Sequence, residues 1–354
     1  MKKIRVGIIG IGQVAQARHI PRLKQDPDVE LVSAWAPKAE KARAAAEKAG
    51  IKHTAASWEE IARSGEVDAV VIATPPVLHL PATKLALESG KHVLSQARMA
   101  RNLKESHEML RLAKQHSKLV TALYPPLPGL KGDRVMERLI KKEGFVGEIR
   151  EVRVTGLAYS PASDEYNWRY DPEASGVNAM TLGMWAEVLH RWVGPAKTVA
   201  AIGRTYSKTR KDRDGKAVPA GVPDSIGITA QLENGAIATY HFATGAAAAP
   251  DQAIEIYGSK GALVYKLFGD EIRAGAAGAK ALEPIEIPAA EVRNQTTDLE
   301  WIRAIRDGTP VRPDFDEGVR YMEFSEAVAL SMKSGKTVTL PMQPSMDSWG
   351  KLIG

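Results

Sequence analysis

The chain has 354 residues, of which 44% are hydrophobic and 25% charged, with a net charge of +6 and no cysteine. Its length suggests about two domains of roughly 150 residues each, and its composition is that of a globular protein with a full core. The lack of cysteine excludes disulfides, thiolate metal sites and a cysteine nucleophile. No apolar run reaches the ~18 residues of a transmembrane helix, and residues 1–3 lead into a strand rather than an apolar leader. We therefore expect a cytoplasmic protein without a membrane partner.

The basic residues are spread along the chain, and the densest run, at 208–213, is interrupted by Asp212 and followed by Asp214 and Gly215. Such a run is more typical of a solvated loop than of a nucleic-acid surface. No His, Asp and Glu residues have the spacing of metal ligands. We therefore expect neither a nucleic-acid partner nor a metal site.

The first third of the chain alternates short apolar segments with helical ones. The apolar segments 4–9, 30–35, 67–73, 92–94 and 119–123 predict buried parallel strands. Helices are expected between them, one of them capped at its start by Asn102 with Glu105 in the capping-box position. This alternation predicts a Rossmann-like, doubly wound α/β domain over residues 1–124.

The Pro/Gly-rich stretch 124–129 marks the predicted domain boundary, and the pattern changes beyond it. Residues 125–354 predict an α+β domain with a mostly antiparallel open sheet, because several strands follow one another without helices between them. The dipeptide Asn234-Gly235 is a hairpin signal. We expect the Ala/Gly-rich piece 274–281 to be a flexible surface turn, and two late helices at about 295–307 and 315–333.

The sequence Gly10-x-Gly12-x-x-Ala15 follows the first strand and opens a helix, which is the setting of a dinucleotide-binding fingerprint. The first glycine permits a tight turn, and the second lets the backbone approach a pyrophosphate. Gln13 and Val14 begin the helix whose N-terminal amides would hold the phosphates. The bland alternative is a tight turn that binds no ligand.

The choice of dinucleotide depends on the end of the second strand. An NAD site usually has an acid there that binds the ribose diol, but this chain has Ala36 and no carboxylate between residues 34 and 38. Lys38 or Lys41 could approach a 2′-phosphate, although both could be plain surface residues. The sequence therefore predicts NADP or NAD, with a lean toward NADP.

The order of motifs resembles the glucose–fructose oxidoreductase / inositol dehydrogenase / MocA-like family over nearly the whole length. The resemblance is carried by these segments: the Gly10–Ala15 loop, residues 70–76 with His79, and residues 88–94, 168–173, 189–194 and 254–261. It implies a nicotinamide site between two domains, with Thr74, Pro75, His79 and Gln96 among the cofactor residues. For His79 a structural role at a helix start is the alternative. The resemblance also implies a homodimer or homotetramer formed through the C-terminal sheet.

The chain departs from this family at the expected acid and base positions. Where the family reads Glu-Lys-Pro after the fifth strand, with a proton-transferring lysine, this chain has Gln96-Ala97-Arg98. The family's catalytic helix has Asp-x-Gly-x-His-x-x-Asp, and this chain has residues 181–188 instead, with Trp185 at the histidine position. The scaffold is thus expected to remain while the proton donor differs.

Arg98 and Tyr124 are expected at the carboxyl ends of parallel strands, where open α/β sheets bind ligands. Arg98 suits a carboxylate or phosphate, or else pairs with a carboxylate of the protein. The other expected substrate residues are aromatic or polar: Trp168, Arg169, Asn178, Thr181 and Trp185. A ring-bearing, anionic substrate is predicted. Tyr124, or alternatively Tyr166, is the expected general acid or base, with a pKa lowered by a nearby cation. Tyr124 could instead stack on the nicotinamide, and Trp185 could merely fill space.

Three functions remain open from the sequence. The first is an NAD(P)-dependent oxidoreductase with an altered proton donor, which the cofactor loop favours. The second is a lyase or glycoside-cleaving enzyme that retains its cofactor. The third is a non-catalytic NAD(P)-binding subunit or sensor, which the loss of every expected acid and base would explain.

Overall fold

The computed structural model describes residues 3–125, 130–158, 166, 168–177, 182–212, 214–294 and 296–342. The chain forms two compact units. The first comprises Met1–Pro126, Glu173–Gly176 and Thr296–Met322, and the second comprises Leu127–Pro172, Val177–Gln295 and Glu323–Gly354. The chain therefore returns twice to the first unit after leaving it.

The first unit is built on a six-stranded sheet in the order β3-β2-β1-β4-β5-β6, and every pairing in it is parallel. This is the Rossmann strand order, so the predicted doubly wound fold is confirmed. The strands are β1 (Ile4–Ile9), β2 (Val29–Trp35), β3 (His53–Thr54), β4 (Ala69–Ile72), β5 (His92–Gln96) and β6 (Thr121–Tyr124).

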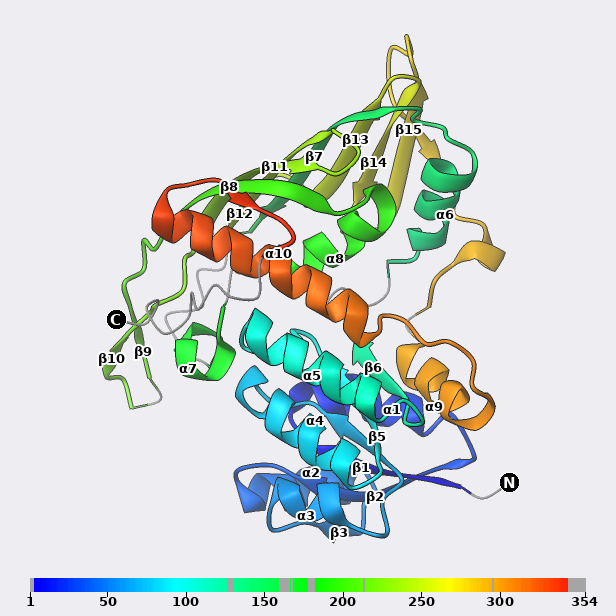
Figure 1. The fold of residues 1–354 in the computed structure, drawn as a ribbon, viewed down its shortest axis with the longest axis vertical. Helices are drawn as coiled ribbons and strands as arrows, with labels where there is room; N and C mark the ends of the chain where they lie inside the picture. The colour runs from blue at the N-terminus through cyan, green and yellow to red at the C-terminus, as the bar shows by residue number, and fades with distance from the viewer. Residues whose placement is uncertain are drawn as a thin grey trace. The chain divides into compact units, whose positions relative to one another are not determined.

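Helices cover this sheet (Figure 1). They are η1 (Ala15–His19), α1 (Ile20–Leu23), α2 (Ala39–Lys48), α3 (Trp58–Arg63), η2 (Pro76–Leu78), α4 (His79–Glu88), α5 (Leu103–Gln115) and α9 (Thr297–Asp307). Residues 13–23 are continuously helical, so η1 and α1 form one helix after the glycine turn. Asn102 caps α5 as predicted, because its Oδ1 accepts from the Glu105 amide at 2.9 Å. The Glu105 carboxylate accepts from the backbone N–H of Arg101 at 3.0 Å.

Helix α9 comes from the end of the chain but packs on the first sheet, beside α1 and against β5 and β6 (Figure 1). Its Trp301 and Ile302 side chains are fully buried in the core of this unit. The apolar residues of α9 recur at helical spacing and so form one face of the helix, which explains this packing. The last third of the sequence thus contributes to the core of the first unit.

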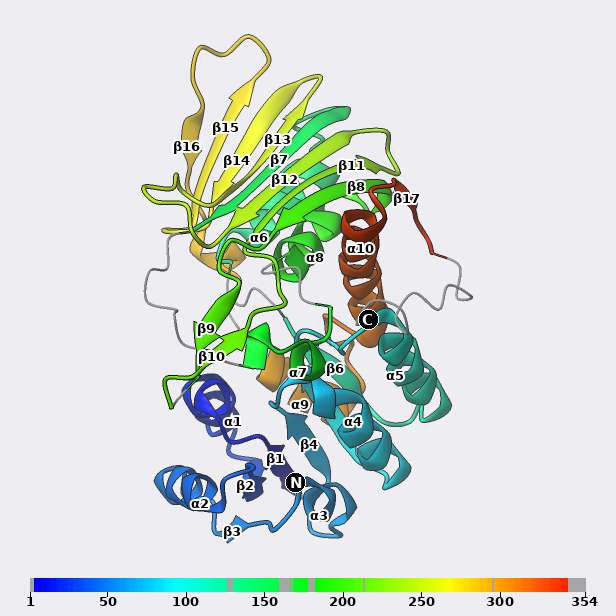
Figure 2. The same ribbon diagram turned by 90° about the vertical axis from the view of Figure 1, so that its left-hand side faces the viewer.

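The second unit contains a nine-stranded sheet in the order β16-β15-β14-β13-β7-β12-β11-β8-β17, shown in Figure 2. Only β7 and β12 pair in parallel, and the other pairings are antiparallel, as predicted. The strands are β7 (Ile149–Leu157), β8 (Ala196–Arg204), β11 (Ser225–Leu232), β12 (Ile237–Ala243), β13 (Ala253–Gly258), β14 (Gly261–Lys266), β15 (Glu271–Ala276), β16 (Glu283–Ile285) and β17 (Val338–Thr339).

Among the described residues, five helical segments and a small hairpin complete the second unit, and α10 extends into it from the first. These elements are α6 (Asp133–Glu137), η3 (Arg138–Lys142), η4 (Trp168–Tyr170), α8 (Leu182–Val193), η5 (Ala289–Glu291), the β9 (Thr209–Lys211) and β10 (Ala217–Pro219) hairpin, and α10 (Phe315–Ser334). The short α7 (Pro172–Ser175) straddles the two units. In the described part of the chain, no helix combines the length and the apolar composition that a bilayer crossing needs.

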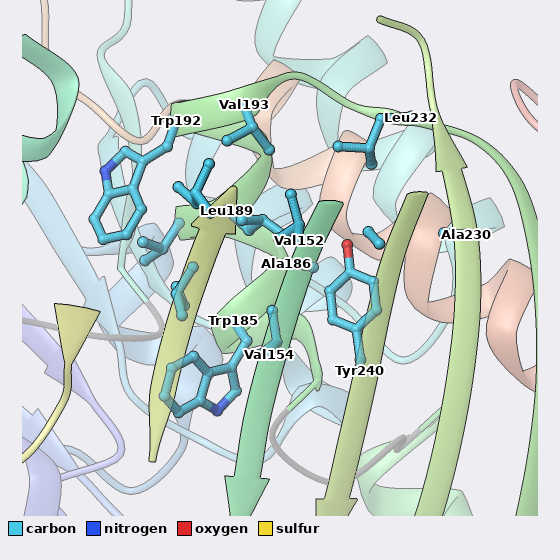
Figure 3. Close-up of a cluster of buried hydrophobic side chains, with 14 of the residues drawn as sticks. Val152, Val154, Trp185, Ala186, Leu189, Trp192, Val193, Ala230, Leu232 and Tyr240 are labelled. Carbon is cyan, nitrogen blue, oxygen red and sulfur yellow. The ribbon is translucent and has the colours of Figure 1, made fainter. Parts of the chain in front are cut away.

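Helix α8 packs on one face of the nine-stranded sheet. Trp185, Leu189 and Trp192 of α8 lie against inward-pointing side chains of the sheet, among them Val154 and Tyr240 (Figure 3). Alternate residues of β12 are buried and exposed, which is the period-2 pattern of a sheet with one covered face.

Two local predictions have opposite outcomes. The Asn234-Gly235 turn is confirmed: Gly235 has φ +91°, and the Leu232 amide donates to the Ala236 carbonyl at 2.8 Å. The prediction that 274–281 is wholly a flexible turn is wrong, since β15 pairs with β14 up to Ala276 and Ala274 is only 8% exposed. Small residues there allow a close-packed strand, which composition alone did not reveal.

Candidate functional site

The glycine turn after β1 has two glycines with different surroundings. Gly10 has φ +98°, and a Cβ placed on it would lie 2.7 Å from the backbone carbonyl of Ala73. A Cβ on Gly12 would meet nothing within 4 Å. Gly10 is therefore required for the packing of the turn on the end of β4, whereas Gly12 leaves the backbone open to an approaching ligand.

The helix begins directly after Gly12, with Gln13 exposed and Val14 half-buried in its first turn. The first amides of a helix have no intrahelical acceptor and attract anions. An open glycine followed by such amides fits the phosphates of a dinucleotide, as the sequence predicts. No described side chain of this turn fills the space over Gly12.

The end of β2 carries no carboxylate. Ala36 is half-buried, and Lys38 is exposed at the start of α2, where its carbonyl accepts from the Ala42 amide at 2.9 Å. A lysine at this place is compatible with a 2′-phosphate.

Three buried hydroxyls lie at the carboxyl ends of neighbouring strands. Thr74 follows β4, Ser95 is near the end of β5, and Tyr124 ends β6. None of these hydroxyls has a hydrogen-bond partner among the described residues. Ser95 pairs with Leu123 and Gln96 pairs with Tyr124, so the Ser95 and Tyr124 side chains point to opposite faces of the sheet and do not converge on one ligand.

The buried His79 ring lies between the segments that follow β4 and β5. Its Nε2 atom lies 2.8 Å from the Thr74 carbonyl oxygen, and its Nδ1 atom lies 2.9 Å from the Arg98 carbonyl oxygen. The ring is 1% exposed, and burial lowers the pKa of His79. The ring therefore lies against both the segment after β4, which includes Pro75, and the segment after β5, and its single N–H donates to one of them.

Arg98 lies two residues beyond β5 and is half-buried. Its guanidinium Nη1 donates to the Ser175 carbonyl at 3.1 Å. The neighbouring Gly176 has φ +66°, and a Cβ there would clash with the backbone of Arg101. The glycine thus brings segment 173–176 close to the residues after β5 and helps place the Arg98 side chain.

The two tyrosines proposed as acid or base have raised rather than lowered pKa values. Tyr124 is 2% exposed, and burial, followed by the charge of Asp298, raises its pKa. Burial and the charge of Asp171 raise the pKa of Tyr166. The expectation of a lowered pKa is wrong because desolvation and nearby carboxylates outweigh any cation.

The aromatic segment before α8 forms cation–π contacts. The Arg169 guanidinium lies 4.4 Å from the Trp168 ring centroid, and the Arg210 guanidinium lies 3.9 Å from the Tyr170 ring centroid. Each ring therefore has one face covered by a cation. Arg210 is only 7% exposed and lies in β9, so the described part of this run, 208–212, is not simply a solvated loop.

The residues expected on one face of α8 have different outcomes. Trp185 is 2% exposed and packs in the core of the second unit (Figure 3). Its ring centroid lies 6.4 Å from that of Phe242. The expectation that it lines a substrate cleft is therefore wrong, since its face of the helix is covered by the sheet. Asn178 and Thr181 lie outside the described residues.

A buried polar cluster in the first unit was not predicted. His19 Nδ1 lies 2.6 Å from Asp298 Oδ1, and His19 Nε2 lies 2.5 Å from the amide nitrogen of Gln96. The His19 ring also meets the Tyr124 ring edge-on at 4.4 Å. Both His19 and Asp298 stand on apolar helix faces, and a polar residue on such a face is the signal that could have identified them.

No group of three or more His, Asp or Glu side chains suited to a metal ion occurs within the described ranges.

Comparison with known proteins places these features in a family. Residues 4–124 match the family model described as "Oxidoreductase family, NAD-binding Rossmann fold", and residues 134–264 match the "GFO/IDH/MocA C-terminal domain". The chain belongs to the GFO/IDH/MocA family of oxidoreductases. It is therefore an NAD-binding oxidoreductase, as the glycine turn and the order of motifs predict.

Individual members of the GFO/IDH/MocA family share modest identity with this chain. An uncharacterized oxidoreductase of Synechocystis sp. is 27% identical over 340 residues, covering 94% of this chain and 90% of that protein. A 1,5-anhydro-D-fructose reductase of Ensifer adhaerens is 28% identical, covering 73% and 75%. A solved structure of levoglucosan dehydrogenase in complex with NADH and levoglucosan has a TM-score of 0.85 at 21% identity, covering 96% of this chain and 100% of that one. This last likeness shows a shared fold.

Proposed function

We propose that this oxidoreductase transfers hydride between NAD(P) and a carbon of a ring-bearing, anionic, sugar-like substrate. The named relatives support the sugar-like part, since 1,5-anhydro-D-fructose and levoglucosan are both sugar derivatives. The observation that carries the anionic part is the half-buried guanidinium of Arg98 beside the carboxyl end of β5.

For the cofactor, the chain offers residues of three kinds. The backbone of Gly12, Gln13 and Val14 would hold the pyrophosphate. Thr74 and Pro75 after β4 and Gln96 at the end of β5 would contact the nicotinamide half of the cofactor. Lys38 would approach a 2′-phosphate. When bound, the nicotinamide ring supplies or accepts the hydride.

Arg98 is the proposed substrate anchor. A guanidinium has five N–H donors in one plane, so it can hold a backbone carbonyl and a carboxylate or phosphate together. The bond to the Ser175 carbonyl at 3.1 Å would restrict the orientation of this plane. A rigid, partly desolvated cation binds an anion more tightly than a mobile surface one. In this proposal Trp168 and Arg169 supply further substrate contacts.

The proton donor is proposed to differ from that of related enzymes, because Ala97 and Trp185 carry no group that titrates. Tyr124 is the candidate donor, with Tyr166 as the alternative. A raised pKa keeps the Tyr124 phenol protonated at neutral pH. Its hydroxyl could therefore give a proton to a substrate carbonyl oxygen as that carbon is reduced, and solvent would then restore the proton.

A substrate panel tests the proposal. Wild-type protein is incubated with NADH or NADPH and the keto forms of a neutral pyranose, a uronic acid and a nucleoside-diphosphate sugar. We expect turnover of an anionic member, with a KM that rises at least about tenfold in Arg98→Met and less in Arg98→Lys. Faster turnover of the neutral sugar, or an unchanged KM in Arg98→Met, would overturn the anionic assignment. Retained cofactor with product formed but no net NADH change would instead favour the lyase class.

The donor is tested separately with Tyr124→Phe and Tyr166→Phe. We expect kcat for reduction to fall about 100-fold in one of them, while the NADH dissociation constant stays within about twofold of wild type because the ring is retained. If neither variant loses activity, neither tyrosine donates the proton.

Self-association through the nine-stranded sheet is also proposed. Ile202 of β8 is 78% exposed, and alternate residues of β12 are exposed on the face that α8 does not cover. Sedimentation should give a dimer or tetramer, and Ile202→Lys should weaken it. A monomer at micromolar concentration would contradict this proposal.

A further inference from the structure

Three side chains that are distant in sequence form a continuous polar chain inside the first unit. Asp298 comes from α9, His19 from the helix after the glycine turn, and Gln96 from the end of β5. Oδ1 of Asp298 lies 2.6 Å from Nδ1 of His19, and Nε2 of His19 lies 2.5 Å from the amide nitrogen of Gln96. His19 and Asp298 are fully buried, while Gln96 is half-buried at the carboxyl edge of the sheet.

The donors and acceptors in this chain can be assigned from chemistry. An amide nitrogen only donates, so Nε2 of His19 accepts from Gln96. The neutral ring then carries its proton on Nδ1 and donates it to the Asp298 carboxylate. The carboxylate thus selects the tautomer of His19, and the tautomer selects which end of the Gln96 amide faces inward.

Gln96 is the last residue of β5, at the carboxyl edge of the parallel sheet. Its neighbour in sequence, Ala97, has no polar side chain, and the hydroxyls of Thr74, Ser95 and Tyr124 around the ends of β4, β5 and β6 lack partners among the described residues. Because one N–H of the Gln96 amide is donated to His19, the positions of its carbonyl oxygen and of its second N–H are fixed. An amide without this hydrogen bond could rotate by half a turn and exchange the positions of its oxygen and nitrogen.

We propose that His19, oriented by Asp298, is a positioning residue that fixes the Gln96 amide toward the bound dinucleotide. Both ring nitrogens of His19 are engaged and the ring is buried, so it touches neither substrate nor cofactor. The inference depends on dinucleotide binding but not on the substrate proposed above, because it can be tested with NADH alone.

Gln96→Glu is the sharpest variant, because it keeps the size of the side chain and leaves His19 and Asp298 in place. A carboxylate has no N–H to donate to Nε2 of His19, so the hydrogen bond that orients the side chain of residue 96 is lost. In histidine-labelled protein, the ¹⁵N spectrum should show the tautomer with its proton on Nδ1 in wild type and a shifted Nε2 resonance in Gln96→Glu. Calorimetry should show NADH affinity lower by at least about tenfold in the variant.

Asp298 supplies a matched pair of variants. Asp298→Asn retains an oxygen that accepts from Nδ1, so the wild-type tautomer and an NADH affinity within about threefold of wild type are expected. Asp298→Leu removes the acceptor and should lower NADH affinity about as much as Gln96→Glu does. His107→Gln, on the exposed side of α5, is the control and should leave the NADH affinity unchanged.

Circular dichroism melting separates positioning from folding. The inference is supported if Gln96→Glu and Asp298→Leu stay folded at the assay temperature and bind NADH weakly. It is overturned if folded Gln96→Glu binds NADH as wild type does, or if its His19 spectrum is unchanged. If wild-type protein itself binds neither NADH nor NADPH, the dinucleotide assignment fails instead, and the two failures are therefore distinguishable.

Discussion

The Nε2 atom of His79 lies 2.8 Å from the carbonyl oxygen of Thr74, on the loop just before its own helix. Its other nitrogen faces the carbonyl oxygens of Arg98 and Met99 at 2.9 and 3.1 Å. One buried ring thus contacts both the segment after β4 and the segment after β5, and in its neutral form it donates a hydrogen bond to one of them. These two segments carry Thr74, Pro75 and Arg98, which are proposed here to meet the cofactor and the substrate.

Replacing His79 with Phe should keep the ring volume but remove the one hydrogen bond that the neutral ring can donate to these buried carbonyls. An unsatisfied buried group costs about 1–3 kcal/mol, so the free energy of unfolding should fall by about 1–3 kcal/mol in urea titrations. The matched control is His107→Phe on the exposed side of α5, which should change stability by less than about 0.5 kcal/mol. Equal stability of the two variants would show that His79 does not hold the loops.

The two glycines of the first turn should respond differently to alanine. Gly10→Ala forces a Cβ to within 2.7 Å of the Ala73 carbonyl in a left-handed backbone conformation, so we expect a loss of at least about 2 kcal/mol of stability. Gly12→Ala meets no atom within 4 Å and should fold normally. Its NADH affinity should nevertheless fall about tenfold or more, because the methyl group occupies the approach to the helix amides.

Thermal melting and NADH titration of both variants check this contrast. Gly12→Ala with wild-type NADH affinity would mean that the phosphates do not approach the backbone at this glycine. A Gly10→Ala variant as stable as wild type would contradict the argument that Gly10 packs against the Ala73 carbonyl.

Lys38 is the position that tests the lean toward NADP. Lys38 is exposed at the start of α2, and residues 34–37 before it contain no carboxylate. Lys38→Ala should raise the NADPH dissociation constant about five- to tenfold at low salt and leave that of NADH unchanged, since one exposed ion pair contributes about 1 kcal/mol. Lys48→Ala, at the far end of the same helix, is the charge-matched control. An equal effect on both cofactors would contradict a 2′-phosphate contact.

Local signals predicted five of the six strands of the first sheet and the starts of several of its helices. The β1 run, the Gly10 turn and the Asn102 cap each depend on a few adjacent residues. The short β3 and the helix α3 were missed, because a strand of two residues has no periodicity to read. Ser57 does cap α3, accepting from the Glu60 amide at 3.3 Å, so its start had a signal.

The candidate site was predicted less completely, since its contacts link distant parts of the chain. His19 and Asp298 are 279 residues apart in sequence and 2.6 Å apart in the fold. Helical periodicity placed Trp185 on a face but could not say that the second sheet covers that face. The pKa of Tyr124 is raised because its side chain is buried and lies near the charge of Asp298. The sequence around residue 124 reveals neither the burial nor the neighbour.

His190 gives a prediction for the second unit. Its ring lies edge-on to Phe324 at 4.8 Å, and its Nε2 is 3.5 Å from the Tyr240 hydroxyl. Burial lowers the pKa of His190 to about 4, whereas a histidine in the unfolded chain titrates near about 6.5. Between these values the unfolded chain binds the proton more readily. The contribution of neutral His190 to stability is therefore complete above about pH 6.5 and is lost as the pH falls toward 4.

Urea unfolding of wild type and His190→Met at pH 7.5 and pH 4.5 checks this dependence. Wild type should lose stability on acidification, with His190 contributing up to about 1.4 kcal/mol per pH unit. His190→Met cannot take up that proton, so its loss should be smaller, although buried His79 will still contribute to it because its pKa is also lowered. Lys197→Met, exposed on β8, should keep the wild-type slope. Identical pH slopes for wild type and His190→Met would mean that His190 is as accessible to protons in the folded unit as in the unfolded chain.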